Sequence, residues 1–205
     1  MTGPHLVPLH DGVTLGILAG GQSSRLGGAD KAWLRRGDGR ALVLDLADHF
    51  GPQVDAVLVS ANRNPERYLS HGLRVIHDRS SGIGPLAGLD ALAAECRSEW
   101  LLTLPVDVLH LPEDLPGRML AGQLPCFAVD ADGQQPLVAL WRSAELHAAT
   151  GQAIEDNDLA VHALQRRLGM RGVDFSNTCF GNLNTPADLV AAGITDFGDR
   201  HTHAI

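Results

Sequence analysis

The sequence predicts an α/β fold, with a mostly parallel, doubly wound mixed sheet in a single domain. Three observations predict this class. Apolar runs of strand length alternate with segments that carry apolar residues at helical spacing. The first apolar run leads directly into a glycine-rich loop, as strands of such sheets often do at their carboxyl ends. The length of 205 residues suits one large domain better than two small ones.

The first half of the chain alternates regularly between strand and helix. We expect strands at residues 14–19, 56–61, 74–77 and 100–104, and helices at residues 41–50 and 86–96. Pro85 stands just inside the start of the second helix, where a missing N–H costs no hydrogen bond, and Pro105 ends the last strand. Strands that are joined through helices pair in parallel, with right-handed crossovers.

The second half is less regular. We expect strands at residues 125–129 and 137–141, a turn at 130–133 between them, and a helix at 159–168. Gly169 marks the end of that helix. Thr185 precedes Pro186 and is followed three residues later by a carboxylate, which is the pattern of a capped helix start. We interpret the polar residues 155–158 as the solvated start of a helix.

The charge of the chain excludes some partners. Its 16 basic and 24 acidic residues give a formal net charge of −8. A molecule with this charge repels nucleic acid and anionic membrane surfaces, so we expect neither as a partner. An anionic nucleotide would have to be attracted by a local group of cations and a metal ion.

The cysteines and the chain ends indicate the compartment. Cys96, Cys126 and Cys179 form no C-x-x-C motif, so the sequence suggests neither a zinc site nor a disulfide framework. No signal peptide is evident, and no apolar run approaches the ~18 residues of a membrane span. We therefore expect a cytoplasmic protein. Residues 1–12 and 196–205 are expected to be mobile ends.

The glycine-rich loop spans residues 18–31, with the sequence LAGGQSSRLGGADK. Its four glycines leave backbone N–H groups open to an anion, and Arg25 and Lys31 add positive charge. The loop matches neither the dinucleotide-binding pattern G-x-G-x-x-G nor the P-loop pattern. We favour phosphate binding over a plain connecting turn, in which the glycines would only permit positive φ.

This loop resembles the signature L-A-G-G-x-S-x-R-[ML]-G-x-D-K of sugar-nucleotide-type nucleotidyltransferases, and within that group it is similar to the molybdenum cofactor guanylyltransferase family. Six later motifs resemble that family in the same order: Ser60–Arg63, His77–Asp78, Gly84–Gly88, Pro105–Asp107, Pro136–Leu137 and Asn182–Pro186. The similarity covers residues 14–190. It implies a Rossmann-like domain of the nucleotide-diphospho-sugar transferase type.

The resemblance assigns roles to these motifs. Arg25 and Lys31 would hold the nucleotide phosphates, and together with Asp107 they are the catalytic candidates. The implied nucleotide-binding residues are Leu18, Ala19, Gly20, Gly21, Arg25, Lys31, Ser60, Asp78, Gly84, Gly88 and Asp107. Gly84 and Gly88 also suit a helix start that packs closely against the sheet, and the two interpretations are compatible.

Asp107 is the candidate metal ligand. It follows the buried strand at residues 100–104, where a turn or capping aspartate is also common. Mg²⁺ is usually held by one or two carboxylates together with substrate phosphates and water, so a single aspartate suffices. The resemblance assigns this role to Asp107 and admits Mn²⁺ in place of Mg²⁺.

Asp78 is the candidate for recognition of the base. A carboxylate can accept hydrogen bonds from both N1–H and the exocyclic amine of guanine, a donor pair that cytosine and adenine lack. The alternative is a solvated aspartate at a strand end. Ser60 stands where the family has asparagine as a nucleotide contact, and serine can still form a hydrogen bond, with a shorter reach.

Asn182 and Asn184 lie just before the capped helix start. The resemblance places them on the acceptor side of the cleft. As turn residues they could equally be satisfied by local backbone hydrogen bonds, and both interpretations stay open.

The resemblance implies a reaction in which GTP and the molybdenum-pterin cofactor give the guanine dinucleotide form of the cofactor and pyrophosphate. It also suggests molybdoenzyme maturation proteins as partners. One alternative is a related cytidylyltransferase or another NTP transferase. The other is a non-catalytic nucleotide-binding module of the same fold, which the presence of both Lys31 and Asp107 disfavours.

Overall fold

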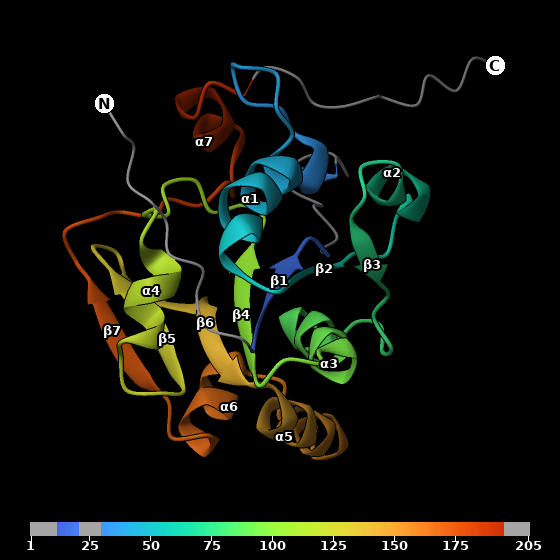
Figure 1. Ribbon diagram of the computed structural model, residues 1–205, viewed down its shortest axis with the longest axis vertical. Helices are drawn as coiled ribbons and strands as arrows, with labels where there is room; N and C mark the ends of the chain where they lie inside the picture. The colour runs from blue at the N-terminus through green and yellow to red at the C-terminus, as the bar shows by residue number, and fades with distance from the viewer. Residues whose placement is uncertain (1–11, 21–29, 195–205) are drawn as a thin grey trace.

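The structure, a computed structural model, describes residues 12–20 and 30–194 (Figure 1). Two residues that the sequence predicts to bind nucleotide, Gly21 and Arg25, lie outside the described residues. The expectation of mobile chain ends also falls almost entirely outside them and stays a prediction.

The described residues form one seven-stranded sheet with the strand order β3-β2-β1-β4-β6-β5-β7. The strands are β1 (Val13–Leu18), β2 (Ala56–Ser60), β3 (Arg74–Ile76), β4 (Trp100–Pro105), β5 (Cys126–Asp130), β6 (Gly133–Arg142) and β7 (Arg171–Phe175). Only β6 pairs antiparallel with its neighbours, β4 and β5. All other pairings in the sheet are parallel. The prediction of a mostly parallel mixed sheet is confirmed.

Helices cover both faces of the sheet. They are α1 (Leu42–Phe50), α2 (Pro65–Leu69), α3 (Pro85–Glu95), α4 (Leu115–Leu120), α5 (Ser143–Glu155), α6 (Val161–Arg167) and α7 (Pro186–Ala191), with two short 3-10 helices, η2 (Lys31–Trp33) and η3 (Gly51–Gln53). Apolar side chains of α1, α2, α4 and α7 belong to one core, and those of α3, α5 and α6 belong to a second core (Figure 1). Two separate cores on opposite faces make the sheet doubly wound, as predicted.

The central strand β1 is buried along its whole length. A strand with neighbours on both sides and helices on both faces must be apolar throughout, which explains its continuous apolar sequence. Leu15 and Ile17 pack in one core, whereas Leu18 packs in the other. At Gly16 an added Cβ would lie 2.9 Å from a methyl group of Leu92, so the absent side chain lets α3 approach the strand.

Two segments of the second half differ from the sequence-based expectation. Residues 155–158 do not start a helix: Glu155 ends α5, and Asn157 then turns the chain with a φ of 54°. Helix α5 itself was not predicted from the sequence. It buries small residues, Ala149 and Ala153, where longer apolar side chains would signal a helix, and no side chain caps its start.

The edge strand β7 and the first residues of β6 also escaped prediction. Strand β7 is mostly exposed, with only Phe175 buried, so it lacks an apolar run. Strand β6 begins at Gly133, well before the predicted start at residue 137, because polar residues pair there with the end of β5. In both places the strand is recognised by its backbone pairing and not by an apolar run.

No helix in the part of the chain that the structure describes combines the length and the apolar character needed to cross a membrane.

Candidate active site

The predicted site residues gather at the carboxyl edge of the parallel strands β3, β2, β1 and β4. Ser60 and Leu18 end β2 and β1, while Asp78 and Asp107 lie just past the ends of β3 and β4. Backbone hydrogen bonds continue past the strands, with Ala19 N donating to Ser60 O at 2.9 Å. Ligands of open α/β sheets bind at this edge, so the sequence motifs meet where the fold favours a site.

Lys31 and Asp107 form an ion pair across this edge. The Nζ atom of Lys31 lies 2.7 Å from Oδ2 of Asp107, and the two side chains are 19% and 22% exposed. Asp30 begins η2 by accepting a hydrogen bond from Ala32 N on Oδ1. Lys31 therefore does not pair with the neighbouring Asp30, which would have been the simplest structural role for it. It points instead at the candidate metal ligand.

The carboxyl group of Asp30 is partly buried, which changes its pKa. Burial raises the pKa of its carboxyl group, and the Ala32 N–H and the positive charges of Arg63 and Arg67 lower it by less. Its Oδ2 atom is buried and bonds to none of the residues that the structure describes. The fold thus sets this aspartate against α2, directly beside Lys31 in the chain.

The donor chemistry of Asp107 suits a hard divalent cation. Only Oδ2 has a partner among the described residues, the Lys31 ammonium group, so Oδ1 can serve as an oxygen ligand. A divalent metal ion is also what the resemblance noted in the sequence implies. A single carboxylate leaves most of the coordination sphere to phosphates and water, which is how Mg²⁺ is normally bound beside nucleotides.

Asp78 is held in a fixed orientation by two side chains from the end of β2. Ser60 Oγ donates to Oδ1 of Asp78 at 3.0 Å, and Asn62 Nδ2 donates to Oδ2 at 2.7 Å. Asn62 Oδ1 in turn accepts the backbone N–H of Asp78 at 3.0 Å. A solvated strand-end aspartate would not need these three bonds. The serine that replaces the family's asparagine still contacts the base-recognition candidate.

Asn62 was not among the predicted site residues. It lies in one of the motifs that carry the resemblance, but its own role could not be read from the chain. The signal that could have found it is the pairing of its motif with Asp78, because the ends of β2 and β3 meet at the same edge. Gly20 completes this corner, since a Cβ added there would lie 3.7 Å from Oδ2 of Asp78.

Gly88 is required for packing. A Cβ at this position would lie 2.8 Å from Ser60 Oγ and 2.8 Å from a methyl group of Leu18, closer than real contacts allow. Gly84 stands before α3 with a φ of 65°, a conformation that favours glycine. Close packing is confirmed at Gly88, whereas at Gly84 no described atom lies within 4 Å of an added Cβ and only the positive φ favours glycine. Nucleotide contact stays a prediction for both.

Asn182 and Asn184 flank a strip of backbone that runs beside Asp107. Asn182 pairs antiparallel with Val108, and Leu183 N donates to Asp107 O at 3.0 Å. The backbone N–H of Asn184 makes local hydrogen bonds, to Asn182 O at 3.2 Å and Asp188 Oδ2 at 2.9 Å, as expected of turn residues. The side-chain amides of both asparagines bond to no described residue, and their contact with an acceptor stays a prediction.

The capped helix start after these asparagines is confirmed. The side chain of Thr185 accepts from Asp188 N, and Asp188 accepts from Asn184 N at 2.9 Å and Thr185 N at 2.7 Å. These backbone N–H donors, with a smaller contribution from the charge of Lys31, hold the pKa of Asp188 below its usual value.

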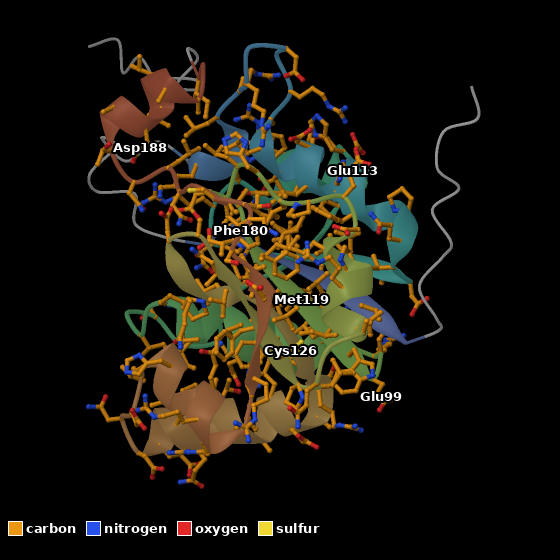
Figure 2. The ribbon with its side chains drawn as sticks, turned by 90° about the vertical axis from the view of Figure 1, so that its left-hand side faces the viewer. Glu99, Glu113, Met119, Cys126, Phe180 and Asp188 are labelled. Carbon is orange, nitrogen blue, oxygen red and sulfur yellow. The ribbon has the colours of Figure 1, made fainter. Side chains whose placement is uncertain are left out.

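In Figure 2 Asp188 lies toward one end of the molecule, and Phe180, Met119 and Cys126 follow in this order toward Glu99, which precedes β4. The segment that carries Asn182 and Asn184 lies at the same edge as Asp107, because Leu183 N donates to Asp107 O.

Two other features of the surface are not part of this site. Asp130, Asp132 and Cys179 have ligand atoms within 4.8 Å of one another. However, both carboxylate oxygens of Asp130 already accept hydrogen bonds, and Cys179 Sγ donates to Asp132 at 2.8 Å. The three groups satisfy one another and the backbone, and form a poor metal site.

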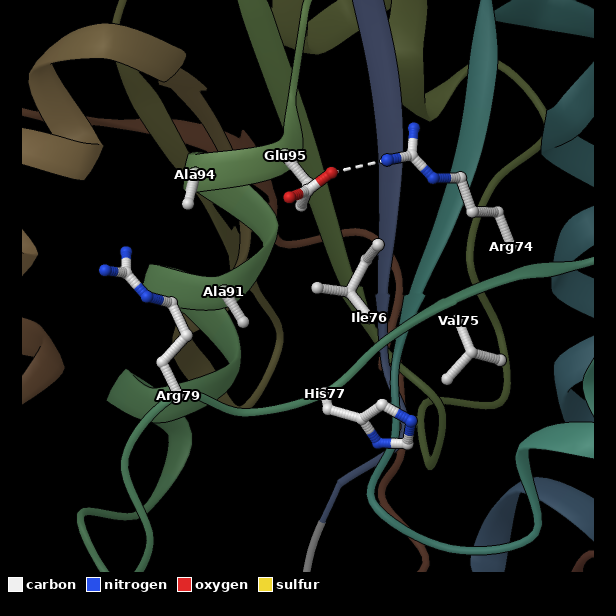
Figure 3. Close-up of a pocket in the computed structure, with 8 residues that line it drawn as sticks. All are labelled: Arg74, Val75, Ile76, His77, Arg79, Ala91, Ala94 and Glu95. Carbon is white, nitrogen blue, oxygen red and sulfur yellow. Dashed lines mark hydrogen bonds and ion pairs between the residues drawn. The ribbon is translucent and has the colours of Figure 1, made fainter.

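A shallow pocket lies between β3 and α3 (Figure 3). Arg74 pairs there with Glu95, and His77 and Arg79 lie on the segment that leaves β3. The pocket contains none of the predicted catalytic or nucleotide-binding residues.

Comparisons with known proteins agree with this geometry. Residues 15–170 match the family described as the MobA-like NTP transferase domain. A "Molybdenum cofactor guanylyltransferase" of Yersinia pseudotuberculosis serotype O:1b is 36% identical over 178 residues, which cover 84% of this chain and 90% of that protein.

Solved structures share the fold. The molybdopterin-guanine dinucleotide biosynthesis protein A from Archaeoglobus fulgidus superposes with a TM-score of 0.71 at 19% identity, over 88% of this chain and 96% of its own. The 2-C-methyl-D-erythritol 4-phosphate cytidylyltransferase from Thermus thermophilus superposes with a TM-score of 0.66 at 18% identity, over 87% of this chain and 96% of its own. At these identities the likeness concerns the fold alone.

Proposed function

The chain belongs to the molybdenum cofactor guanylyltransferase family, within the MobA-like NTP transferases, and from this premise we propose that it transfers GMP from GTP to a molybdenum-pterin cofactor. The products are the guanine dinucleotide form of the cofactor and pyrophosphate. The observation that carries the proposal is the 2.7 Å contact of Lys31 with Asp107 at the carboxyl edge of the sheet, beside the oriented Asp78.

In this reaction an oxygen of the acceptor's terminal phosphate attacks the α-phosphorus of GTP. The bond between the α-phosphorus and the bridging oxygen to the β-phosphate breaks, and the electron pair leaves with pyrophosphate. The acceptor phosphate is already largely ionised at neutral pH, so no strong general base is needed. Positioning and neutralisation of the growing negative charge then carry the rate.

Lys31 is suited to neutralise that charge. Its ammonium group has three donor hydrogens and is held at 2.7 Å from one carboxylate oxygen, which leaves donors for phosphate oxygens. Arg25, from the glycine-rich loop, is proposed as the second cation, and Gly20 and Gly21 as backbone contacts to the nucleotide.

Asp107 would hold the metal ion, which we propose to be Mg²⁺, with Mn²⁺ as a substitute. When bound, the ion supplies positive charge to the phosphates. Asp107 itself is well placed for this, because Val106 N donates to Leu18 O at 3.0 Å and so fixes the turn after β4 against β1.

Asp78 is proposed to select guanine. Ser60 and Asn62 each use one acceptor site of its carboxylate, and each oxygen keeps a further lone pair for N1–H and the exocyclic amine of the base. Cytosine presents no such adjacent donor pair. Asn182 and Asn184, with free amides beside Asp107, are proposed to bind the acceptor. A cytoplasmic location and contacts with maturation proteins of molybdoenzymes belong to the same proposal.

The test combines nucleotide binding with product formation. The purified chain is melted with GTP, CTP, ATP or UTP and Mg²⁺, because a ligand that binds only the folded state raises the melting temperature. We expect the largest increase with GTP, and release of pyrophosphate only when the molybdenum-pterin cofactor is added. A larger increase with CTP would indicate a cytidylyltransferase. Binding of GTP without any product would indicate a non-catalytic module.

A further inference from the structure

The segment that carries Asn182 and Asn184 is joined to the turn that carries Asp107 by backbone hydrogen bonds, and buried side chains of both pack in one core. Leu109 N and His110 N both donate to Phe180 O, at 3.1 and 2.9 Å, and Leu183 N donates to Asp107 O at 3.0 Å. We call residues 180–184 the acceptor segment. Its position relative to Asp107 therefore depends on where the backbone of Phe180 is held.

One buried carboxylate holds Phe180 from the other side. Asp130 ends β5 and is only 3% exposed. Its Oδ2 accepts the backbone N–H of Phe180 at 2.8 Å, while Oδ1 accepts Asp132 N and Gln135 Nε2, both at 3.0 Å. Hydrogen bonds to an ionised carboxylate are shorter and stronger than neutral ones, so this is a firm attachment.

The carboxylate remains charged although it is buried. Burial raises the pKa of Asp130, but the Gln135 amide and the backbone N–H groups of Phe180 and Asp132 outweigh it and hold the pKa below its usual value. An apolar residue here would leave the N–H groups of Phe180 and Asp132 without this acceptor, so Asp130 also stabilises the fold. A positioning role is distinguished from this structural one by a selective effect on the acceptor.

We infer that Asp130 is a positioning residue, which fixes the acceptor segment against the turn after β4 and thereby sets Asn182 and Asn184 for the acceptor. This inference rests on the proposed function. We call Asp78, with its partners Ser60 and Asn62, the nucleotide corner. The hydrogen bonds of Asp130 reach neither this corner nor the candidate catalytic groups.

The inference predicts a selective effect. Asp107 has a second anchor, because β4 and the bond from Val106 N to Leu18 O hold its turn independently of the acceptor segment. Loosening Phe180 should therefore displace Asn182 and Asn184 more than Asp107. The nucleotide corner, formed by the ends of β2 and β3, should not move.

The test is Asp130→Asn. The amide can keep one oxygen for Asp132 N and Gln135 but turns its NH₂ group toward the N–H of Phe180, which loses its acceptor. We expect the KM for the molybdenum-pterin acceptor to rise by about tenfold, the size expected when supporting contacts are lost, while the KM for GTP changes by less than about twofold. Hydrogen exchange should show loss of protection at the amides of Phe180 and Leu183.

Asp55→Asn is the matched control. Asp55 also accepts two backbone N–H groups, those of Gly12 and Val13 at 2.6 and 2.9 Å, but at the opposite edge of the sheet. We expect a lower melting temperature from this variant without any change in the ratio of the two KM values. Equal rises of both KM values in Asp130→Asn, or no rise in either, would overturn the inference and leave Asp130 a purely structural residue.

A second variant covers the case in which Asp130→Asn does not fold. Gln135→Ala removes one of the two donors that orient Oδ1, so the carboxylate that accepts from Phe180 N is held less firmly although that bond can still form. It should give a smaller rise in the acceptor KM, again without a change for GTP, and an unchanged acceptor KM would contradict the inference. If the wild-type chain formed no product at all, the proposed function would fail, whereas the exchange data on Phe180 and Leu183 would still test the attachment.

Discussion

In the half of the site at the ends of β1, β2 and β3, side chains meet across neighbouring strand ends, whereas in the half beyond β4 the backbone makes most of the connections. Ser60 and Asn62 reach Asp78 from the adjacent strand. On the other side, residues 180–184 are attached through Phe180 and Leu183 to segments far away in the chain. We call these the nucleotide half and the acceptor half.

The difference matters for what a mutation can do. In the nucleotide half a substitution changes one side chain, and the parallel strands keep the frame in place. In the acceptor half a substitution at Asp130 can move a whole segment without touching a substrate. The ion pair of Lys31 and Asp107 lies between the two halves and joins residues 76 positions apart.

The largest effect is expected at this junction. Lys31→Ala or Asp107→Ala should lower turnover by about 10²–10³, because an aimed charge is removed from a preorganised site. The melting temperature without ligand should hardly change, because a partly exposed ion pair contributes only about 0–1 kcal/mol. Steady-state release of pyrophosphate beside a thermal melt measures both quantities.

A matched control for this pair is Arg40→Ala, which removes an exposed ion pair with Asp48 outside the site. It should leave both turnover and stability nearly unchanged. Normal turnover in Lys31→Ala would remove Lys31 from the site and weaken the phosphate-binding role of the glycine-rich loop.

Gly88→Ala should damage the nucleotide half through packing. The new methyl group would press on Ser60 and Leu18 at 2.8 Å, and overpacking of this kind costs about 1–3 kcal/mol of the free energy of unfolding. Because Ser60 orients Asp78, the affinity for GTP should fall as well. Denaturant unfolding and nucleotide titration measure the two effects.

Gly151→Ala provides the control, since this glycine lies inside α5 with no atom within 4 Å of an added Cβ. It should stabilise the chain by up to about 1 kcal/mol, the usual gain from alanine in a helix. If Gly88→Ala proved equally stabilising, the close approach of α3 to Ser60 would be wrong.

Asp78→Asn should affect the choice of base more than the fold. Loss of the carboxylate removes charge-assisted acceptors for guanine, and we expect the affinity for GTP to fall by about tenfold while that for CTP changes little. The increases in melting temperature with GTP and with CTP measure how far the preference for GTP is reduced. Equal shifts for GTP and CTP in the wild-type chain would show that Asp78 does not select the base.

The smallest expected effect is a difference in stability at acid pH between the acceptor half, around Asp130, and the segment around Asp30. The pKa of Asp130 is lowered in the fold, so its contribution to stability is present above the unfolded value of about 3.9 and is lost as the pH falls through the folded value. The pKa of Asp30, beside Lys31, is raised by burial. Its contribution to stability therefore changes with pH in the opposite direction: it is lost as the pH rises through the folded value and is present at lower pH.

On acidification below about pH 4, amides near Phe180 should therefore lose exchange protection before those near Trp33, which follows Asp30 in η2. Asp130→Asn should reduce this dependence on pH. Simultaneous loss of protection in both places would mean that the two halves open as one unit.

Sequence patterns located the nucleotide half well. Continuous apolar runs gave β1, β2 and β4 close to their observed ends, because central parallel strands must be apolar on both faces. The capping pattern at Thr185 predicted the start of α7 correctly, because a helix cap is made by residues that are neighbours in the chain.

The partners of these residues could not be predicted in the same way. Nothing in the chain near Lys31 indicates that it pairs with Asp107, and nothing near Asp130 indicates that it holds Phe180. Helix α5, with its small buried residues, and β7, with its exposed ones, also lack a local signal.

By itself, then, the sequence determined the central strands β1, β2 and β4, the cap at Thr185 and the choice of Lys31, Asp78 and Asp107 as candidates, since these depend on local apolar spacing and on motifs of a few residues. The tertiary structure alone decided which of them meet. The strand order places β6 and β5 beyond β4, and this order brings the end of β5 within reach of Phe180. A hydrogen bond between distant residues depends on that order and on the register of the sheet, which no local stretch of sequence contains.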